Sequence, residues 1–137
     1  MVFVSALVCE GAAGLQVQKM SLEAHIQQLT GADAVDCGTQ LRGTSIPEAM
    51  QQSLTCARNM ANQHKAFRFI QWVQGEDSQI AFGVLGERDG STLWFDYDSA
   101  SCGGPGCAER FATKPCPLSN VVVLHDADGR HQFGCIR

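Results

Sequence analysis

The sequence predicts a disulfide-stabilised α+β domain, and three observations lead to that fold class. First, 137 residues with 45% hydrophobic and 18% charged side chains have the length and composition of one globular domain. Second, apolar residues recur with a helical period up to residue 64 and with a period of two from residue 66. Third, seven cysteines are more than a metal-free cytosolic domain ordinarily carries.

Two helices are predicted before residue 65. A short N-terminal helix over 21–31 has Ser21 as its cap, apolar residues at positions 22, 26 and 29, and Gly31 as its stop. The segment 32–44 is expected to be a loop. A long helix over about 46–64 follows, where Ser45 and Glu48 have capping-box spacing. Its apolar stripe is Ile46, Ala49, Met50, Leu54, Ala57, Met60 and Ala61.

Five strands are predicted to form one antiparallel sheet beneath the long helix. Their expected ranges are 66–74, 79–86, 91–98, 120–125 and 130–136. Asp89-Gly90 is the strongest hairpin dipeptide between them, and Asp126-Ala127-Asp128-Gly129 is read as a turn of the same kind rather than a calcium loop. The stretch 101–117, rich in cysteine, glycine and proline, is expected to be a bridged loop.

Register then assigns the side chains to two faces. Pairing Phe69 with Val84 and Val84 with Phe95 collects one apolar face, interrupted only by Gln71. That face comprises Phe67, Phe69, Val73, Ile80, Phe82, Val84, Leu93, Phe95 and Tyr97. It is expected to pack against the long helix.

The opposite face carries the candidate binding residues Arg68, Ile70, Trp72, Trp94, Asp96 and Asp98. Two tryptophans, an arginine and two carboxylates are side chains that protein-binding surfaces use. The alternative is that the short helix or the 101–117 segment covers this face, which would make Trp72 and Trp94 part of a second small core.

The cysteines are expected to form disulfides. Cys37 and Cys56 would tie the loop to the long helix, and the favoured pairing of the last four is Cys102 with Cys107 and Cys116 with Cys135. A four-thiolate zinc site from those last four is the alternative, but the paired Cys-x2-Cys spacing is lacking. We expect no metal and no cofactor.

Residues 1–14 resemble the end of a secretory signal, with a short apolar run before small residues near Ala13. The basic opening of a signal is absent, and the apolar run is short. Its removal would leave residues 15–137 as the mature domain, with six cysteines, in the periplasm or outside the cell. The alternatives are a first strand of an intracellular fold and a lipoprotein anchored at Cys9.

The sequence narrows the possible functions mainly by arguing against several classes of partner and of enzyme. A net charge of −4 without a basic cluster argues against a nucleic-acid partner, and no segment is long and apolar enough to span a membrane. No nucleophile elbow, phosphate-binding loop or zinc-protease motif occurs. We expect an exported, non-enzymatic domain that binds another protein, as an inhibitor or immunity-type protector. The alternatives are a small secreted hydrolase using Asp96, Asp98 or His125, and a structural envelope protein.

Overall fold

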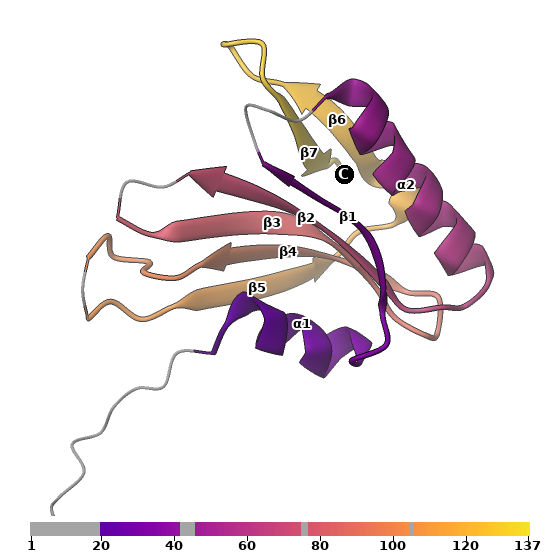
Figure 1. The fold of residues 1–137 in the computed structure, drawn as a ribbon, viewed down its shortest axis with the longest axis horizontal. Coiled ribbons are helices and arrows are strands. Elements are labelled where there is room, and N and C mark those ends of the chain that lie inside the picture. Colours follow the sequence, from indigo (N-terminus) through magenta and orange to yellow (C-terminus); the bar gives the residue numbers. More distant parts are fainter. Residues whose placement is uncertain (1–19, 42–45, 75–76, 105) are drawn as a thin grey trace, which may run out of the picture.

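In the part of the chain that the structure describes, the fold is α+β, with two α-helices, a five-stranded mixed sheet and a separate two-stranded sheet (Figure 1). The computed structural model describes residues 20–41, 46–74, 77–104 and 106–137. Its elements are α1 (Leu22–Thr30), β1 (Val35–Leu41), α2 (Pro47–Asn62), β2 (Phe67–Gln74), β3 (Gln79–Gly86), β4 (Thr92–Asp98), β5 (Arg110–Pro115), the short 3-10 helix η1 (Leu118–Asn120), β6 (Val121–His125) and β7 (His131–Cys135). The predicted signal segment, with Cys9, lies outside the described residues.

The large sheet has the strand order β1-β2-β3-β4-β5. Strands β2 to β5 form an antiparallel meander, whereas β1 runs parallel to β2 and is joined to it through α2, the kind of crossover a parallel pair requires. The expectation of one antiparallel sheet is therefore wrong in two respects. Strands β1 and β5 come from segments expected to be loops, and the strands predicted at 120–125 and 130–136 form their own hairpin.

A bulge makes β1 hard to recognise from the sequence. The register against β2 shifts between Asp36 and Thr39, and the Asp36 carboxylate accepts a hydrogen bond from the Gly38 amide at 2.9 Å. Gly38 has φ +137, and a Cβ atom there would lie 2.5 Å from Ser53 Oγ of α2. Glycine thus lets α2 approach the β1 backbone, and the Cys37–Cys56 disulfide links the same two elements.

Both helices end with a backbone in the left-handed half of φ space. Helix α1 begins at Ser21, whose Oγ accepts from the Ala24 amide, and it stops at Gly31 with φ +83. Helix α2 stops at Asn62, and His64 has φ +53. The amides of His64 and Lys65 donate to the carbonyls of Ala61 and Met60, which is a Schellman motif with histidine where glycine is usual.

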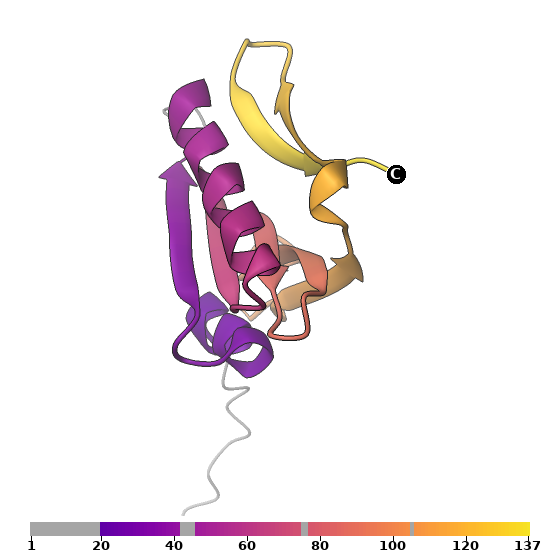
Figure 2. The ribbon, with the colours of Figure 1, turned by 90° about the vertical axis from the view of Figure 1, so that its right-hand side faces the viewer.

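The structure has three layers, with the sheet between α1 on one side and α2 with the β6–β7 hairpin on the other (Figures 1 and 2). Each side has its own core. The α2-face core contains Cys37, Met50, Leu54, Ala57, Phe67, Phe69, Val84, Trp94, Cys116, Val121 and Phe133. The α1-face core contains Leu22, Ile26, Ile70, Ala81, Leu85, Phe95 and Tyr97. Helix α1 thus covers the second face, as in the alternative reading of the sequence, but only Trp72 packs against that core, whereas Trp94 belongs to the α2-face core.

The β3–β4 register differs by one residue from the expected one. Phe69 lies opposite Val84 as predicted, but Val84 lies opposite Trp94 rather than Phe95. The expected pairing of Val84 with Phe95 implies a two-residue loop at Asp89-Gly90. Instead the loop has three residues, 88–90, with Gly90 at φ +88 and a Glu87 to Ser91 backbone hydrogen bond of 2.9 Å.

A shift of one residue moves every side chain of a strand to the opposite face of the sheet. Leu93, Phe95 and Tyr97 therefore face α1. Trp94 is part of the α2-face core, and Asp96 and Asp98 lie on the same side of β4 as Trp94.

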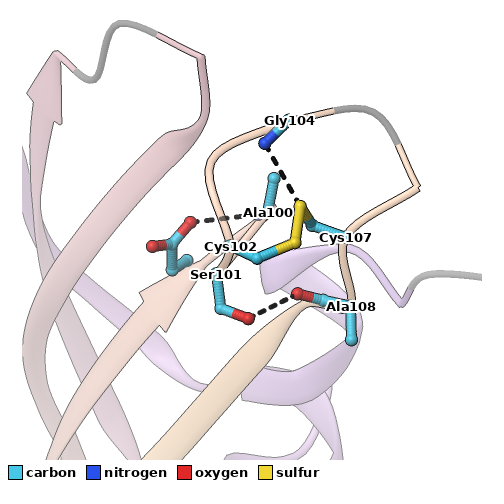
Figure 3. Close-up of a disulfide and its surroundings, with 7 residues drawn as sticks. Ala100, Ser101, Cys102, Gly104, Cys107 and Ala108 are labelled. Carbon is cyan, nitrogen blue, oxygen red and sulfur yellow. Dashed lines mark hydrogen bonds between the residues drawn. A yellow bond between two sulfur atoms is a disulfide. The ribbon is translucent and has the colours of Figure 1, made fainter.

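The disulfides pair as the sequence favoured. Cys116–Cys135 joins the segment after β5 to the end of β7, with a Cα–Cα distance of 6.3 Å. Cys102–Cys107 closes the β4–β5 loop (Figure 3). In that loop the Ser101 hydroxyl donates to the Ala108 carbonyl at 2.9 Å. Three disulfides are compatible with an oxidising extracellular compartment.

Candidate functional site

The revised register separates the six predicted binding residues into two groups. Arg68, Ile70 and Trp72 remain on the α1 face, whereas Trp94, Asp96 and Asp98 lie on the α2 face. The expectation of one continuous surface is therefore wrong. Members of each group nevertheless line a pocket, one on each side of the sheet.

The first pocket, which we name the α1-face pocket, has a volume of about 330 Å³. It lies where the first turn of α1 crosses the sheet, so side chains from the helix and from four strands meet there. Its lining residues are Ser21, Leu22, Glu23, Thr39, Arg68, Ile70, Trp72, Gln79 and Tyr97. Alternation along β2 brings Arg68, Ile70 and Trp72 to this side together.

The apolar part of the pocket combines buried side chains with a partly exposed one. Ile70 and Tyr97 are buried in the α1-face core, whereas Trp72 is only partly buried and packs against that core. The Trp72 ring meets the Tyr97 ring edge-on, with centroids 6.5 Å apart and planes at 88°. Burial, with a smaller contribution from the negative charge of Glu109, raises the pKa of Tyr97, so its phenol stays neutral at physiological pH.

The polar part is an ion pair between Arg68 of β2 and Glu23 of α1. The Arg68 guanidinium donates from Nη1 to Glu23 Oε1, and the side chains are 21% and 49% exposed, respectively. This hydrogen bond holds the pKa of Glu23 below its usual value, so the carboxylate remains ionised. The pair holds Arg68 at the pocket, beside the aromatic part.

The second pocket, which we name the hairpin groove, has a volume of about 310 Å³ and lies between the sheet and β7. Its lining residues are Phe82, Trp94, Asp96, Lys114, Gln132, Phe133, Gly134 and Cys135. Trp94 is 6% exposed and stacks on Phe82, with centroids 5.6 Å apart, so it acts mainly as a core residue. Asp96 is exposed at the groove.

Asp98 lines neither of these pockets. Its Oδ1 accepts a hydrogen bond from the Ala100 amide at 3.0 Å, at the point where the chain leaves β4 for the disulfide-closed loop. Local backbone capping of this kind is a common use of aspartate in turns. This hydrogen bond accounts for an aspartate at position 98 as a turn residue.

A histidine–glutamate pair was not predicted. His25 of α1 lies 3.0 Å through Nε2 from Oε1 of Glu109, which also accepts from the Met20 amide at 3.0 Å. The His25 ring stacks on Phe111 of β5, with centroids 4.5 Å apart. The partners are 84 residues apart, so no local pattern connects them. They tie α1 to the β5 side of the sheet.

The residues proposed for a hydrolase occupy three different settings. Asp96 lines the hairpin groove, Asp98 caps a turn, and His125 pairs with His131 at the end of the β6–β7 hairpin. No histidine lines the α1-face pocket or the hairpin groove. Among the described residues, no three histidine, cysteine or acidic side chains gather as a metal site would require.

The fold and its pockets define a small three-layer α+β domain constrained by three disulfides. Comparisons with protein-family models, with curated proteins and with solved structures found no match. In the described part of the chain, neither helix has the length and apolar character needed to cross a bilayer. Function is therefore inferred from the pockets and the side chains that line them.

Proposed function

We propose that this chain is an exported, non-enzymatic domain that binds another protein through the α1-face pocket. The observation that carries the proposal is the meeting of Trp72 and Tyr97 with the Arg68–Glu23 ion pair around one accessible hollow. Tryptophan, tyrosine and arginine are the side chains that most often dominate the free energy of protein–protein binding. The pocket retains three of the six residues predicted from the sequence.

The size of the pocket favours a protein partner over a separate small molecule. A volume of 330 Å³ is near the lower end of the roughly 300–1,000 Å³ range of ligand sites. It suits one anchoring side chain of a larger partner. Because Arg68 and Glu23 largely neutralise each other, the fitting anchor is uncharged, with an apolar body against Trp72 and a polar tip.

Export agrees with the disulfides and with the predicted signal in residues 1–14. Three bridges help the domain to keep its fold outside the cell, which suits an inhibitor or an immunity-type protector. A structural envelope protein would also have both sheet faces covered. The open pocket beside the first turn of α1 favours the binding role.

Site-specific photocrosslinking tests this proposal. A benzoylphenylalanine residue replaces Gln79, an exposed residue that lines the same pocket, so that Trp72 is kept. The full-length chain is then incubated with the exported proteins of the source cells. We expect a discrete crosslinked protein whose yield falls at least tenfold when Arg68→Ala is added. The same photoreactive residue at Leu124, which is 40% exposed on β6, is the matched control. Circular dichroism establishes that each variant is folded.

Equal crosslinking from positions 79 and 124, or none from position 79 in a folded chain, would exclude the α1-face pocket as the interface. Adducts from position 124 alone would move the interface to the hairpin. Turnover of ester or phosphate substrates that is lost in Asp96→Asn or His125→Asn would instead establish the hydrolase alternative.

A further inference from the structure

Two histidines face each other at the end of the β6–β7 hairpin. His125 and His131 are directly paired in the antiparallel register, and their ring centroids are 4.3 Å apart. The Gln71 side chain donates to the His131 carbonyl at 3.1 Å and accepts from the Phe133 amide at 2.9 Å. These β7 backbone groups therefore point away from β6.

Outward backbone groups identify His125 and His131 as a non-hydrogen-bonded pair. Such pairs have Cα atoms only about 4.5 Å apart, and their side chains lie closer than in the alternating hydrogen-bonded pairs. The Gln71 contacts also hold the backbone of β7 in place at residues 131 and 133. The two imidazoles are thus positioned by the sheet rather than by a loop.

Within the part of the chain that the structure describes, His131 Nδ1 is a buried nitrogen that lacks a hydrogen-bond partner. In the nearby turn, Asp126 accepts from the amides of Asp128 and Arg130 and is ion-paired with the Arg130 guanidinium. A buried polar atom without a partner is unfavourable, and a bound ligand would remove that cost.

We propose that His125 and His131 form a two-imidazole site for a late first-row divalent metal ion, with Cu²⁺ bound most tightly. Imidazole nitrogen bonds such ions at about 2.0–2.1 Å, and affinity in this series is greatest for Cu²⁺. His131 supplies Nδ1, and the exposed His125 ring rotates to supply the second nitrogen. Water completes the coordination. This site is independent of the α1-face pocket.

The test is a Cu²⁺ titration of the full-length protein in a non-coordinating buffer. Calorimetry measures Kd, and electron paramagnetic resonance counts the nitrogens bound to copper. We expect two imidazole nitrogens in the wild type. His125→Asn and His131→Asn should each leave one nitrogen and raise Kd at least about tenfold, since even outer partners of metal ligands contribute that much.

His64→Asn is the matched control, because His64 lies at the end of α2 and asparagine tolerates its φ of +53. That variant should keep two nitrogens and the wild-type Kd. His131 is partly buried, so its variant is interpreted only if folded, whereas exposed His125 keeps the test decisive. Unchanged Kd and nitrogen count in His125→Asn, or equal loss in His64→Asn, would overturn the proposal.

Discussion

The two faces of the sheet are built differently although they share the same strands. The α2 face is covered by a 16-residue helix and by the hairpin, and two disulfides and the Gln71 hydrogen bonds fix those covers. The α1 face is covered by a 9-residue helix that none of the three disulfides reaches. Covalent constraint is thus concentrated on one face, and the α1-face pocket lies on the other.

The two tryptophans give the sharpest test of this difference. Trp94→Ala removes a buried ring that stacks on Phe82 in the α2-face core, and we expect a loss of about 3–5 kcal/mol in the free energy of unfolding. Trp72→Ala, at the accessible pocket, should cost less than half as much. Urea unfolding measures both values. Equal costs, or a larger cost for Trp72, would contradict the β4 register described here.

The same pair of tryptophans shows what the sequence could and could not predict. In β2 and β3 the two sides of the strands differ enough in apolar content for the pattern to predict the register. The structure confirms that β2–β3 register. Strand β4 reads Leu93-Trp94-Phe95, apolar on both sides, so its pattern cannot choose a face. The choice then depended on whether the Asp-Gly turn has two or three loop residues, which the dipeptide alone does not determine.

The edge strands were missed for a different reason. Strand β1 contains a bulge at Cys37-Gly38, and β5 follows a glycine-rich loop and ends at Pro115, so both segments carry loop signals. The residues that pair with β1 are also distant in the chain, since Val35 lies opposite Phe67. The cysteine pairings were easier to infer, because only three pairings exist for the last four and the short Cys102–Cys107 loop is readily closed.

Two disulfides can be compared by removing each in turn. Cys116–Cys135 holds the β6–β7 hairpin on the α2 face, whereas Cys102–Cys107 only closes a loop. The double variant Cys116→Ala/Cys135→Ala opens a separation of 19 residues and exposes a buried site, with an expected cost of about 3 kcal/mol. Cys102→Ala/Cys107→Ala opens a separation of 5 residues and should cost about 2 kcal/mol. Thermal unfolding of the two variants measures which one loses more stability. A larger loss in Cys102→Ala/Cys107→Ala would show that fixing the hairpin on the α2 face contributes little to stability.

Gln71 is a buried polar residue on the side of β2 that also carries Phe67 and Phe69, and its hydrogen bonds explain its presence there. Its buried side-chain amide donates to the His131 carbonyl and accepts from the Phe133 amide. It therefore hydrogen-bonds to the edge of β7 as the backbone of a neighbouring strand would. Gln71→Leu leaves both backbone groups without that partner and should cost about 2 kcal/mol. Gln51→Leu on the exposed side of α2 is the control and should change little. Faster amide exchange at Phe133 in Gln71→Leu would locate the effect.

The ends of the two covering helices provide the smallest comparison. Helix α2 places His64 at φ +53, where a side chain costs roughly 1 kcal/mol, so His64→Gly should stabilise the protein by up to about that amount. Helix α1 already has Gly31 at φ +83 and ψ +165, a region that is essentially restricted to glycine.

Gly31→Ala should therefore destabilise the protein by about 1 kcal/mol or more, since the added Cβ would also lie 3.1 Å from Asp33 Oδ1. His64→Ala separates backbone from side-chain effects, because alanine retains the cost of positive φ. Differential scanning calorimetry of the three variants decides the matter. If His64→Gly and His64→Ala unfold at the same temperature, the backbone at His64 carries no strain. The C-terminal end of α2 would then be no less favourable than that of α1.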